Sequence, residues 1–354
     1  MTGHALRRQR AVARLKADAL LVSHPANVRY LTGFTGSNAQ LLLAPGFALL
    51  FTDPRYGLQV REETGCQARV LKGNALAGVA RAVARLGFRK LAFESSHMPH
   101  GSHHFLEERL GKVSLEPNKG RVEKLRMVKS PDEVDLIRAS VRLTSEAFDR
   151  ALEHLRPGLS ENFFAAEIEF QMRALGAEKP AFETIVTSGE RSALVHARPS
   201  GDPILKDEVL LIDMGAQREG YSSDMTRTVF LGKPGKEVKR LYRAVLEAQR
   251  AAIDRIRPGV STIDVDRAAR DRLRADGLEE LFLHSTGHGL GLEVHEPPRV
   301  SRRQKTLLEA GMVITVEPGV YRKGFGGIRI EDTVLVTETG CEVLTPTPKD
   351  LLAI

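Results

Sequence analysis

The stretch LEHLRPGLSENFFAAEIEFQMRALGAE, which begins at Leu152, is echoed by IDRIRPGVSTIDVDRAARDRLRADGLE, which begins at Ile253. Each copy predicts the end of one helix, an Arg-Pro-Gly turn and a second helix capped by a serine. The two turns lie 101 residues apart, from Pro157 to Pro258. A supersecondary unit repeated in this way indicates an internal duplication.

Further pairs of motifs follow each copy in the same order. Their members are separated by 99 to 107 residues and are Val195-His196 with Val294-His295, Asp213 with Glu317, and Asp224 with Glu331. We expect the two histidine motifs to lie in strand-rich stretches. Four matches in one order favour duplication over coincidence. Two similar halves would pack about a pseudo-twofold axis, so corresponding residues should meet across it.

The duplicated acids stand where apolar strands are predicted to end. Asp213 closes the run 209–212, and Glu317 closes the run 313–316. Four carboxylates gathered about one axis would repel one another and raise their pKa values, which cations between them would relieve. Carboxylate-rich sites suit hard divalent ions such as Mn²⁺, and one imidazole widens the choice to Co²⁺, Fe²⁺ or Zn²⁺.

That imidazole is expected from residues 282–298, FLHSTGHGLGLEVHEPP, which contain His284, His288 and His295. Glycines on both sides of His288 let the backbone approach a site closely. The segment is not a phosphate loop, because no helix follows it. It is not an H-E-x-x-H zinc motif either, because Pro297-Pro298 forbids the required helix. The chain also has no G-x-S-x-G nucleophile motif.

The first 124 residues predict a smaller α/β domain. Strands are expected at 19–22, 39–43, 47–52, 68–71 and 91–94, and a helix at 75–86. The domain should end at a turn over 117–120. Ser130, Pro131 and Glu133 then form the start signal of a long helix, so a second domain is expected over 125–354.

Composition excludes several other classes of protein. The net charge of +7 comes mostly from arginines dispersed among acids, which indicates a solvated surface rather than a nucleic-acid face. Two cysteines fit a reducing compartment, and no apolar run is long enough to cross a membrane. The basic start is expected to form a cytoplasmic amphipathic helix. The histidines at 97, 100, 103 and 104 are expected in a surface loop entering a helix, not in a metal site.

The motifs together resemble the pita-bread metallopeptidases, which comprise methionine aminopeptidase, aminopeptidase P, Xaa-Pro dipeptidase (prolidase) and creatinase. NVRYLTGF at 27–34 and TDPRY at 52–56 resemble the amino-terminal domain of the proline-specific and creatinase branch. LRMVKS at 125–130 resembles the start of the catalytic domain. The resemblance covers nearly the whole chain. It implies an α/β (α+β) protein with a creatinase-like domain over 1–124 and a pseudo-twofold pita-bread domain over 125–354.

The resemblance also implies a ligand set for two divalent metal ions, most simply Mn²⁺, with Co²⁺ or Zn²⁺ as alternatives. The five ligands would be Asp213, Asp224, His288, Glu317 and Glu331. Asp213 would chelate one ion, His288 and Glu317 would complete the shell of the other, and Asp224 and Glu331 would bridge. The repeat agrees with this set, because the two bridging residues are repeat mates.

In that family a hydroxide shared by the two ions attacks the scissile carbonyl, with Glu317 carrying the proton to the leaving nitrogen. His196 and His295 would donate hydrogen bonds to the substrate carbonyl. His284 would orient a ligand. Arg329 would either anchor substrate or pair with Glu331 or Asp332 to hold the site.

We therefore expect a cytoplasmic, homodimeric exopeptidase that cuts the bond before proline, most similar to Xaa-Pro dipeptidase. Aminopeptidase P, acting on longer X-Pro peptides, is the alternative. Creatinase fits less well because that family lacks the full ligand set, and a non-enzymatic binding module would have lost ligands. Arg55 and Tyr56 could reach a neighbouring active site in a dimer, or could be an exposed arginine beside a core-facing tyrosine.

Overall fold

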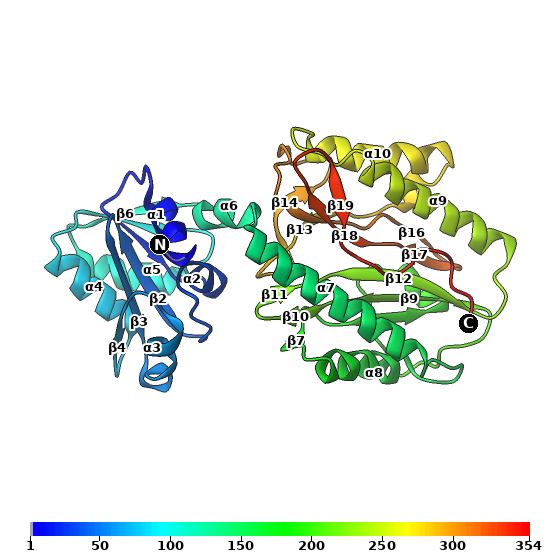
Figure 1. Ribbon diagram of the computed structural model, residues 1–354, viewed down its shortest axis with the longest axis horizontal. Helices are drawn as coiled ribbons and strands as arrows, with labels where there is room; N and C mark the ends of the chain where they lie inside the picture. The colour runs from blue at the N-terminus through cyan, green and yellow to red at the C-terminus, as the bar shows by residue number, and fades with distance from the viewer. Residues whose placement is uncertain (1–2) are drawn as a thin grey trace. The chain divides into compact units, whose positions relative to one another are not determined.

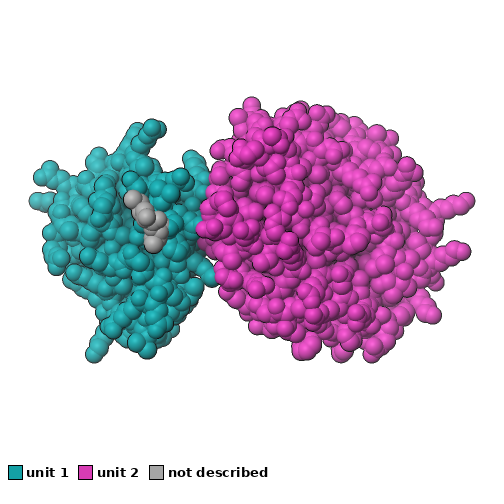
Figure 2. Space-filling model, in the orientation of Figure 1, with its two compact units in different colours: residues 1–126 teal, residues 127–354 magenta. Residues whose placement is uncertain are grey.

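The computed structural model describes residues 3–354 and divides the chain into two compact units, Met1–Arg126 and Met127–Ile354 (Figure 2). Sequence patterning places the domain boundary between residues 124 and 125. Among residues 3–354, no helix combines the length and apolarity needed to cross a bilayer.

The first unit is built on one six-stranded sheet with the strand order β4-β3-β2-β1-β5-β6 (Figure 1). Its strands are β1 (Ala19–Val22), β2 (Ala39–Ala44), β3 (Phe47–Thr52), β4 (Gln67–Val70), β5 (Lys90–Glu94) and β6 (Ser114–Asn118). Its helices are α1 (Gly3–Val12), α2 (Pro25–Thr32), η1 (Pro54–Tyr56), α3 (Gln59–Glu63), α4 (Ala75–Arg85), α5 (His100–Leu110) and α6 (Arg121–Met127), the last of which leads into the second unit. The five strands expected from the sequence are present within one or two residues.

The sixth strand was not expected, because Pro117 lies within it and proline reads as a turn signal. β6 pairs only with β5, in parallel, so it is an edge strand of the sheet. Proline is tolerated there because one edge of the strand has no neighbouring strand, so a residue on that edge needs no backbone N–H for the ladder. The histidine segment also differs from expectation, since α5 already begins at His100. His97 lies before the helix, with its Nε2 2.8 Å from Glu123 Oε1.

The motif at 52–56 forms a compact turn on the first unit. Asp53 accepts a hydrogen bond from the Arg55 backbone N–H and pairs with its guanidinium at 2.9 Å. The Arg55 side chain is 72% exposed. The Tyr56 ring packs edge-on against Phe34, and its hydroxyl lies 2.7 Å from Ser37 Oγ. An exposed arginine beside a packed tyrosine is therefore the arrangement within this unit.

The second unit has two halves, each with a pair of helices and its own strands. The first half contains α7 (Pro131–Leu152), α8 (Glu161–Ala174), β7 (Lys179–Pro180), β8 (Ile185–Ser188), η2 (Gly189–Ala193), β9 (Glu208–Met214), β10 (Ala216–Arg218), β11 (Tyr221–Ser222) and β12 (Met225–Leu231). The second half contains α9 (Lys236–Ile253), α10 (Thr262–Ala275), η3 (Glu279–Leu281), β13 (Gly287–Gly289), β14 (Glu296–Val300), β15 (Val313–Val316), β16 (Gly319–Arg322), β17 (Gly326–Arg329), β18 (Asp332–Val336) and β19 (Cys341–Val343). Figure 1 shows α7 and α8 on one side of the strands and α9 and α10 on the other.

The two copies of the repeat have the same local structure. Ser160 caps α8 and Ser261 caps α10, each accepting a hydrogen bond from a backbone N–H in the first helical turn. Gly158 and Gly259, in the preceding turns, have φ values of 94° and 83°. Each glycine donates its N–H to a carbonyl 2.8 Å away, at equivalent places in the two halves. The turn needs a left-handed residue, which explains the glycine in both copies.

Each half has its own apolar core, and the strands that carry the acids lie between the two cores. The first core packs α7 and α8 against β9 and β12 and includes Phe164 and Ile212. The second packs α9 and α10 against β15 and β18 and includes Leu241 and Ile314. The carboxylates are thereby held at or directly beside the ends of strands that are anchored in these cores.

Candidate metal centre

Strand ends bring the four acids to one place. Asp213 lies near the end of β9, where it pairs with Thr226 of β12. Asp224 directly precedes β12, Glu317 directly follows β15, and Glu331 directly precedes β18. All four line a single cavity of about 660 Å³.

His288 lies in β13, between two glycines that allow close packing of the backbone. A Cβ atom at Gly287 would stand 2.0 Å from the Thr315 carbonyl oxygen, and one at Gly289 would stand 2.2 Å from the Pro297 carbonyl oxygen. Neither position accepts a side chain. His288 also donates its backbone N–H to Thr315 Oγ1 at 3.1 Å, which fixes the strand against β15.

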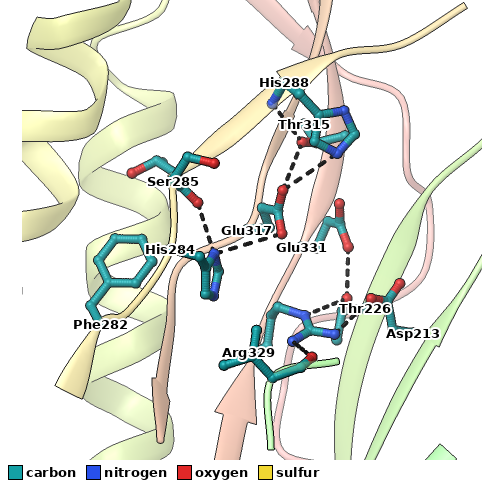
Figure 3. Close-up of polar contacts among 12 residues, drawn as sticks. Asp213, Thr226, Phe282, His284, Ser285, His288, Thr315, Glu317, Arg329 and Glu331 are labelled. Carbon is teal, nitrogen blue, oxygen red and sulfur yellow. Dashed lines mark hydrogen bonds and ion pairs between the residues drawn. The ribbon is translucent and has the colours of Figure 1, made fainter. Parts of the chain in front are cut away.

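The His288 ring faces the acids (Figure 3). Its Nε2 is 3.5 Å from Asp224 Oδ2 and 3.5 Å from Glu317 Oε1. Ligand atoms of Asp224, His288 and Glu331 all lie within 4.8 Å of one another. The Nδ1 of His288 lies 3.0 Å from the Gly289 carbonyl oxygen, so Nδ1 carries the hydrogen and the Nε2 lone pair points at the carboxylates.

The buried carboxylates of this cluster repel one another, and bound cations would relieve that repulsion. Burial, reinforced by the neighbouring carboxylates, raises the pKa values of Asp224 and Glu331 well above their usual range. Burial also raises the pKa of Glu317 to about 7. Burial and nearby His295 lower the pKa of His288 to about 4, so its imidazole is neutral at physiological pH. Divalent ions would stabilise the protonation states that act as ligands, which are ionised carboxylates and a neutral imidazole.

The hydrogen bonding of Asp213 is a second indication of a cation site. Its Oδ2 accepts a hydrogen bond from Arg329 Nη2 at 2.6 Å, whereas its Oδ1 is buried and has no hydrogen-bond partner among residues 3–354. A buried carboxylate oxygen without a donor is costly unless a cation approaches it. The residues present therefore fit a divalent metal site.

Arg329 differs from the expectation that it binds substrate. Its side chain is only 2% exposed, and its nitrogens donate to Asp213, Thr226 Oγ1 and the Tyr321 hydroxyl. With its donors directed to groups of the chain, Arg329 holds Asp213 in place. Pairing with Glu331 or Asp332 was the alternative considered from the sequence, but the acid that Arg329 contacts is Asp213.

Tyr321, on β16, is a site residue that the sequence did not reveal. Its hydroxyl accepts a hydrogen bond from Arg329 Nη1 at 2.9 Å and lies 2.7 Å from His284 Nε2. His284 in turn lies 4.0 Å from Glu317 Oε2 through its Nδ1 (Figure 3). A tyrosine in a strand four residues after an acid carries no signal of its own, so only the structure identifies it.

The two remaining histidines of the predicted site also line the cavity, but neither lies in a strand. His196 follows η2 in a turn, and His295 lies in a bend directly before β14. Both are exposed, as groups that meet a ligand must be. The ring centroids of His295 and His288 are 4.2 Å apart. The stretches are strand-rich as expected, with β8 and β9 on either side of His196 and β13 and β14 on either side of His295, but the histidines themselves lie outside the strands.

An apolar pocket beside His196 and His295 and a cation for a substrate carboxylate were expected, but the sequence did not identify the residues that supply them. Phe182, Ile185 and Val195 give one part of the cavity an apolar surface. Arg299, on β14, adds a cation, and its side chain has no hydrogen bond or ion pair within the described residues. The cavity thus combines an apolar wall, an acidic cluster, two imidazoles and an unpaired guanidinium.

Comparison with known proteins relates this arrangement to a family. Residues 135–338 match metallopeptidase family M24, and residues 6–128 match the creatinase/prolidase N-terminal domain. The chain is 37% identical to an Xaa-Pro dipeptidase of Pyrococcus horikoshii, over 95% of this chain and 94% of that protein.

Solved structures show the same likeness. An Xaa-Pro dipeptidase from Bacillus anthracis superposes with a TM-score of 0.95 at 38% identity, covering 99% of each chain. An X-Pro aminopeptidase from Thermotoga maritima superposes with a TM-score of 0.92 at 37% identity, covering 98% of this chain and all of that one. The fold is therefore the pita-bread fold preceded by a creatinase-type domain, and the chain belongs to metallopeptidase family M24.

Proposed function

We propose that this protein is a metal-dependent exopeptidase that hydrolyses the X-Pro peptide bond, acting chiefly as an Xaa-Pro dipeptidase. The observation that carries the proposal is the convergence of Asp213, Asp224, His288, Glu317 and Glu331 in one cavity. The similarity to Xaa-Pro dipeptidases along almost the full chain supports the same substrate class.

These five residues would hold a pair of divalent ions, for which we propose Mn²⁺ because four of the five ligands are carboxylates. When bound, such ions lower the pKa of water and supply a nucleophile near neutral pH. Glu317, whose carboxyl lies between His284 and His288, is placed to take a proton and deliver it to the leaving nitrogen.

The imidazoles at the mouth of the cavity would act on the substrate. His196 and His295 donate hydrogen bonds to the carbonyl oxygen as negative charge develops on it. Arg329 and Tyr321 do not touch the substrate in this scheme. They orient Asp213, as partners of a ligand commonly do in metal sites.

The other residues that line the cavity suit a dipeptide substrate that ends in proline. The wall formed by Phe182, Ile185 and Val195 suits the apolar proline ring, and Arg299 is the free cation that would pair with the terminal carboxylate. Substitution Arg299→Gln should raise the KM for Ala-Pro by about tenfold or more, with a smaller change in kcat.

The decisive experiment is an assay of the Mn²⁺-supplemented enzyme on Ala-Pro and Ala-Pro-Ala. A dipeptidase hydrolyses the first and discriminates against the second. Good hydrolysis of both would make the enzyme an X-Pro aminopeptidase instead, the activity named for the Thermotoga maritima relative. Failure to cleave either peptide after reconstitution with Mn²⁺, Co²⁺ and Zn²⁺ would refute the proposal.

We also propose that the enzyme works as a homodimer in the cytoplasm. The cytoplasmic assignment is supported by Cys66 and Cys341, which are both free thiols and suit a reducing compartment. The dimer rests on the family resemblance. Light scattering coupled to size-exclusion chromatography tests it, and a monomeric mass at micromolar concentration would contradict it.

A further inference from the structure

A second cavity, of about 540 Å³, adjoins the catalytic one and is strongly basic. We call it the basic basin and define it by its four arginines, Arg270, Arg299, Arg302 and Arg303, by Ser301 and Gln304, and by the residues that it shares with the catalytic cavity. No aspartate or glutamate lines it. Its size falls within the range of small-molecule sites.

The basic basin and the catalytic cavity share part of their lining. His284, Ser285 and Arg299 belong to both. β14 links them as well, because His295 precedes this strand on the catalytic side and Arg302 and Arg303 follow it on the basin side. β14 is an edge strand of its five-stranded sheet. A peptide leaving the catalytic cavity past Arg299 would therefore enter the basic basin.

The charges of the basin are offset only weakly by the chain, because Glu279, the acid that interacts with Arg302, is itself held in an ion pair with Arg274 at 2.6 Å. Arg302 and Arg303 are exposed, and neither guanidinium makes a hydrogen bond or ion pair with any residue in the range 3–354. The fourth arginine of the lining, Arg270, is different, because Asp266 holds it at 2.8 Å and it is buried. Free guanidinium groups favour carboxylates, which they bind through paired N–H donors.

We propose that the basic basin is a subsite for an acidic residue that follows proline, so that X-Pro-Glu and X-Pro-Asp peptides are accepted in preference to uncharged tripeptides. This inference rests on the proposed X-Pro cleavage and extends it beyond the proline. Arg299 would no longer meet the proline carboxylate in such a peptide. Arg302 and Arg303 would instead bind the two carboxylates of the third residue.

The test compares kcat/KM for Ala-Pro-Glu and Ala-Pro-Gln, which differ in charge but hardly in shape. The wild-type enzyme should prefer Ala-Pro-Glu by about tenfold at low salt. The preference should shrink in about 0.5 M sodium chloride, where exposed charges are screened. In the double variant Arg302→Gln/Arg303→Gln it should fall to about twofold or less, while Ala-Pro is hydrolysed at the wild-type rate.

A matched control is Arg250→Gln/Arg255→Gln, which removes the same charge from exposed positions outside both cavities. This variant should keep the preference. Equal rates on the two tripeptides, or a preference that survives in Arg302→Gln/Arg303→Gln, would overturn the proposal. So would binding of inorganic phosphate to the basin without any preference for Ala-Pro-Glu, because the site would then serve a free oxyanion.

A binding measurement separates this inference from the proposed function. Calorimetric titration of the metal-free protein with Pro-Glu and Pro-Gln needs no catalysis. Tighter binding of Pro-Glu that is lost in Arg302→Gln/Arg303→Gln supports the basin even if Ala-Pro is not cleaved. Equal binding of the two dipeptides counts against the basin even if Ala-Pro is cleaved.

Discussion

Replacing Tyr321 by phenylalanine tests whether Arg329 and Tyr321 orient Asp213, a proposed metal ligand. The hydroxyl accepts one hydrogen bond from the charged Arg329 at 2.9 Å and makes another with neutral His284 at 2.7 Å. A bond to a charged group contributes about 1.5–3 kcal/mol and a neutral one about 0.5–1.5 kcal/mol. Tyr321→Phe should therefore lower the free energy of unfolding by about 2–4.5 kcal/mol.

The same change should weaken metal binding. Arg329 loses one of the partners that fix its position, and Asp213 depends on Arg329 for the orientation of its carboxylate. Loss of such a supporting contact typically costs ten- to a hundredfold in metal affinity. The assay is a calorimetric titration with Mn²⁺, together with unfolding in urea followed by circular dichroism.

Tyr242→Phe is the matched control. Both tyrosines are 4% exposed, but the Tyr242 hydroxyl donates to the Lys349 carbonyl oxygen at 3.1 Å, away from the cavity. It should cost about 1 kcal/mol in stability and leave Mn²⁺ affinity unchanged. If Tyr321→Phe binds Mn²⁺ as tightly as the wild type, Tyr321 and Arg329 do not orient the ligand and the reasoning is wrong.

Three further predictions concern the acids and the repeat. Metal-free protein should lose about 3 kcal/mol of stability as the pH rises from about 4 to 8, because the folded state binds a proton at Glu317 with a pKa of about 7, above its ordinary 4.5. Thermal melts at a series of pH values check this loss, and added Mn²⁺ should abolish it. Glu331→Gln should raise the melting temperature of the metal-free protein at about pH 8, because burial raises the pKa of Glu331 and so makes this carboxyl destabilising above its ordinary pKa, a cost that an amide does not carry. The same variant should abolish stabilisation by Mn²⁺. Gly158→Ala and Gly259→Ala should each lower the free energy of unfolding, measured in urea, by about 1–2 kcal/mol. The cost comes from the left-handed backbone alone, because no atom lies within 4 Å of either new Cβ, and the two costs should add in the double variant.

Local signals in the sequence were enough to locate several of the helices and strands. Ser130, Pro131 and Glu133 form the predicted capping box at the start of α7. The strands at 19–22 and 47–52 match their predicted bounds, because each is a short apolar run. β6 was missed because its proline is permitted only by its place at the sheet edge, and place in a sheet is a tertiary property.

In the site, too, the sequence predicted some features, whereas others depend on tertiary packing. The repeat pairs Asp213 with Glu317 and Asp224 with Glu331, and this pairing predicted that the acids meet. It carried no signal for Tyr321, which acts on Asp213 only through Arg329. Nothing in the sequence around residue 329 distinguishes an arginine that contacts substrate from one buried against an acid. Burial decides between those roles, and burial depends on how the two halves pack.

The packing of the halves also explains why the site requires both of them. Thr226, in the first half, donates its hydroxyl hydrogen to Glu331 Oε2 at 2.6 Å, and Thr228 both accepts from the Arg329 N–H and donates to its carbonyl oxygen. These bonds join β12 to the strand segment that carries Glu331. Each half supplies only two of the four carboxylates, and only the second supplies His288. One half alone would present a pair of acids to solvent, where water satisfies them and no cation is needed. Burial of both pairs against each other creates the repulsion that bound ions relieve, so the interface between the halves is itself the origin of the metal affinity.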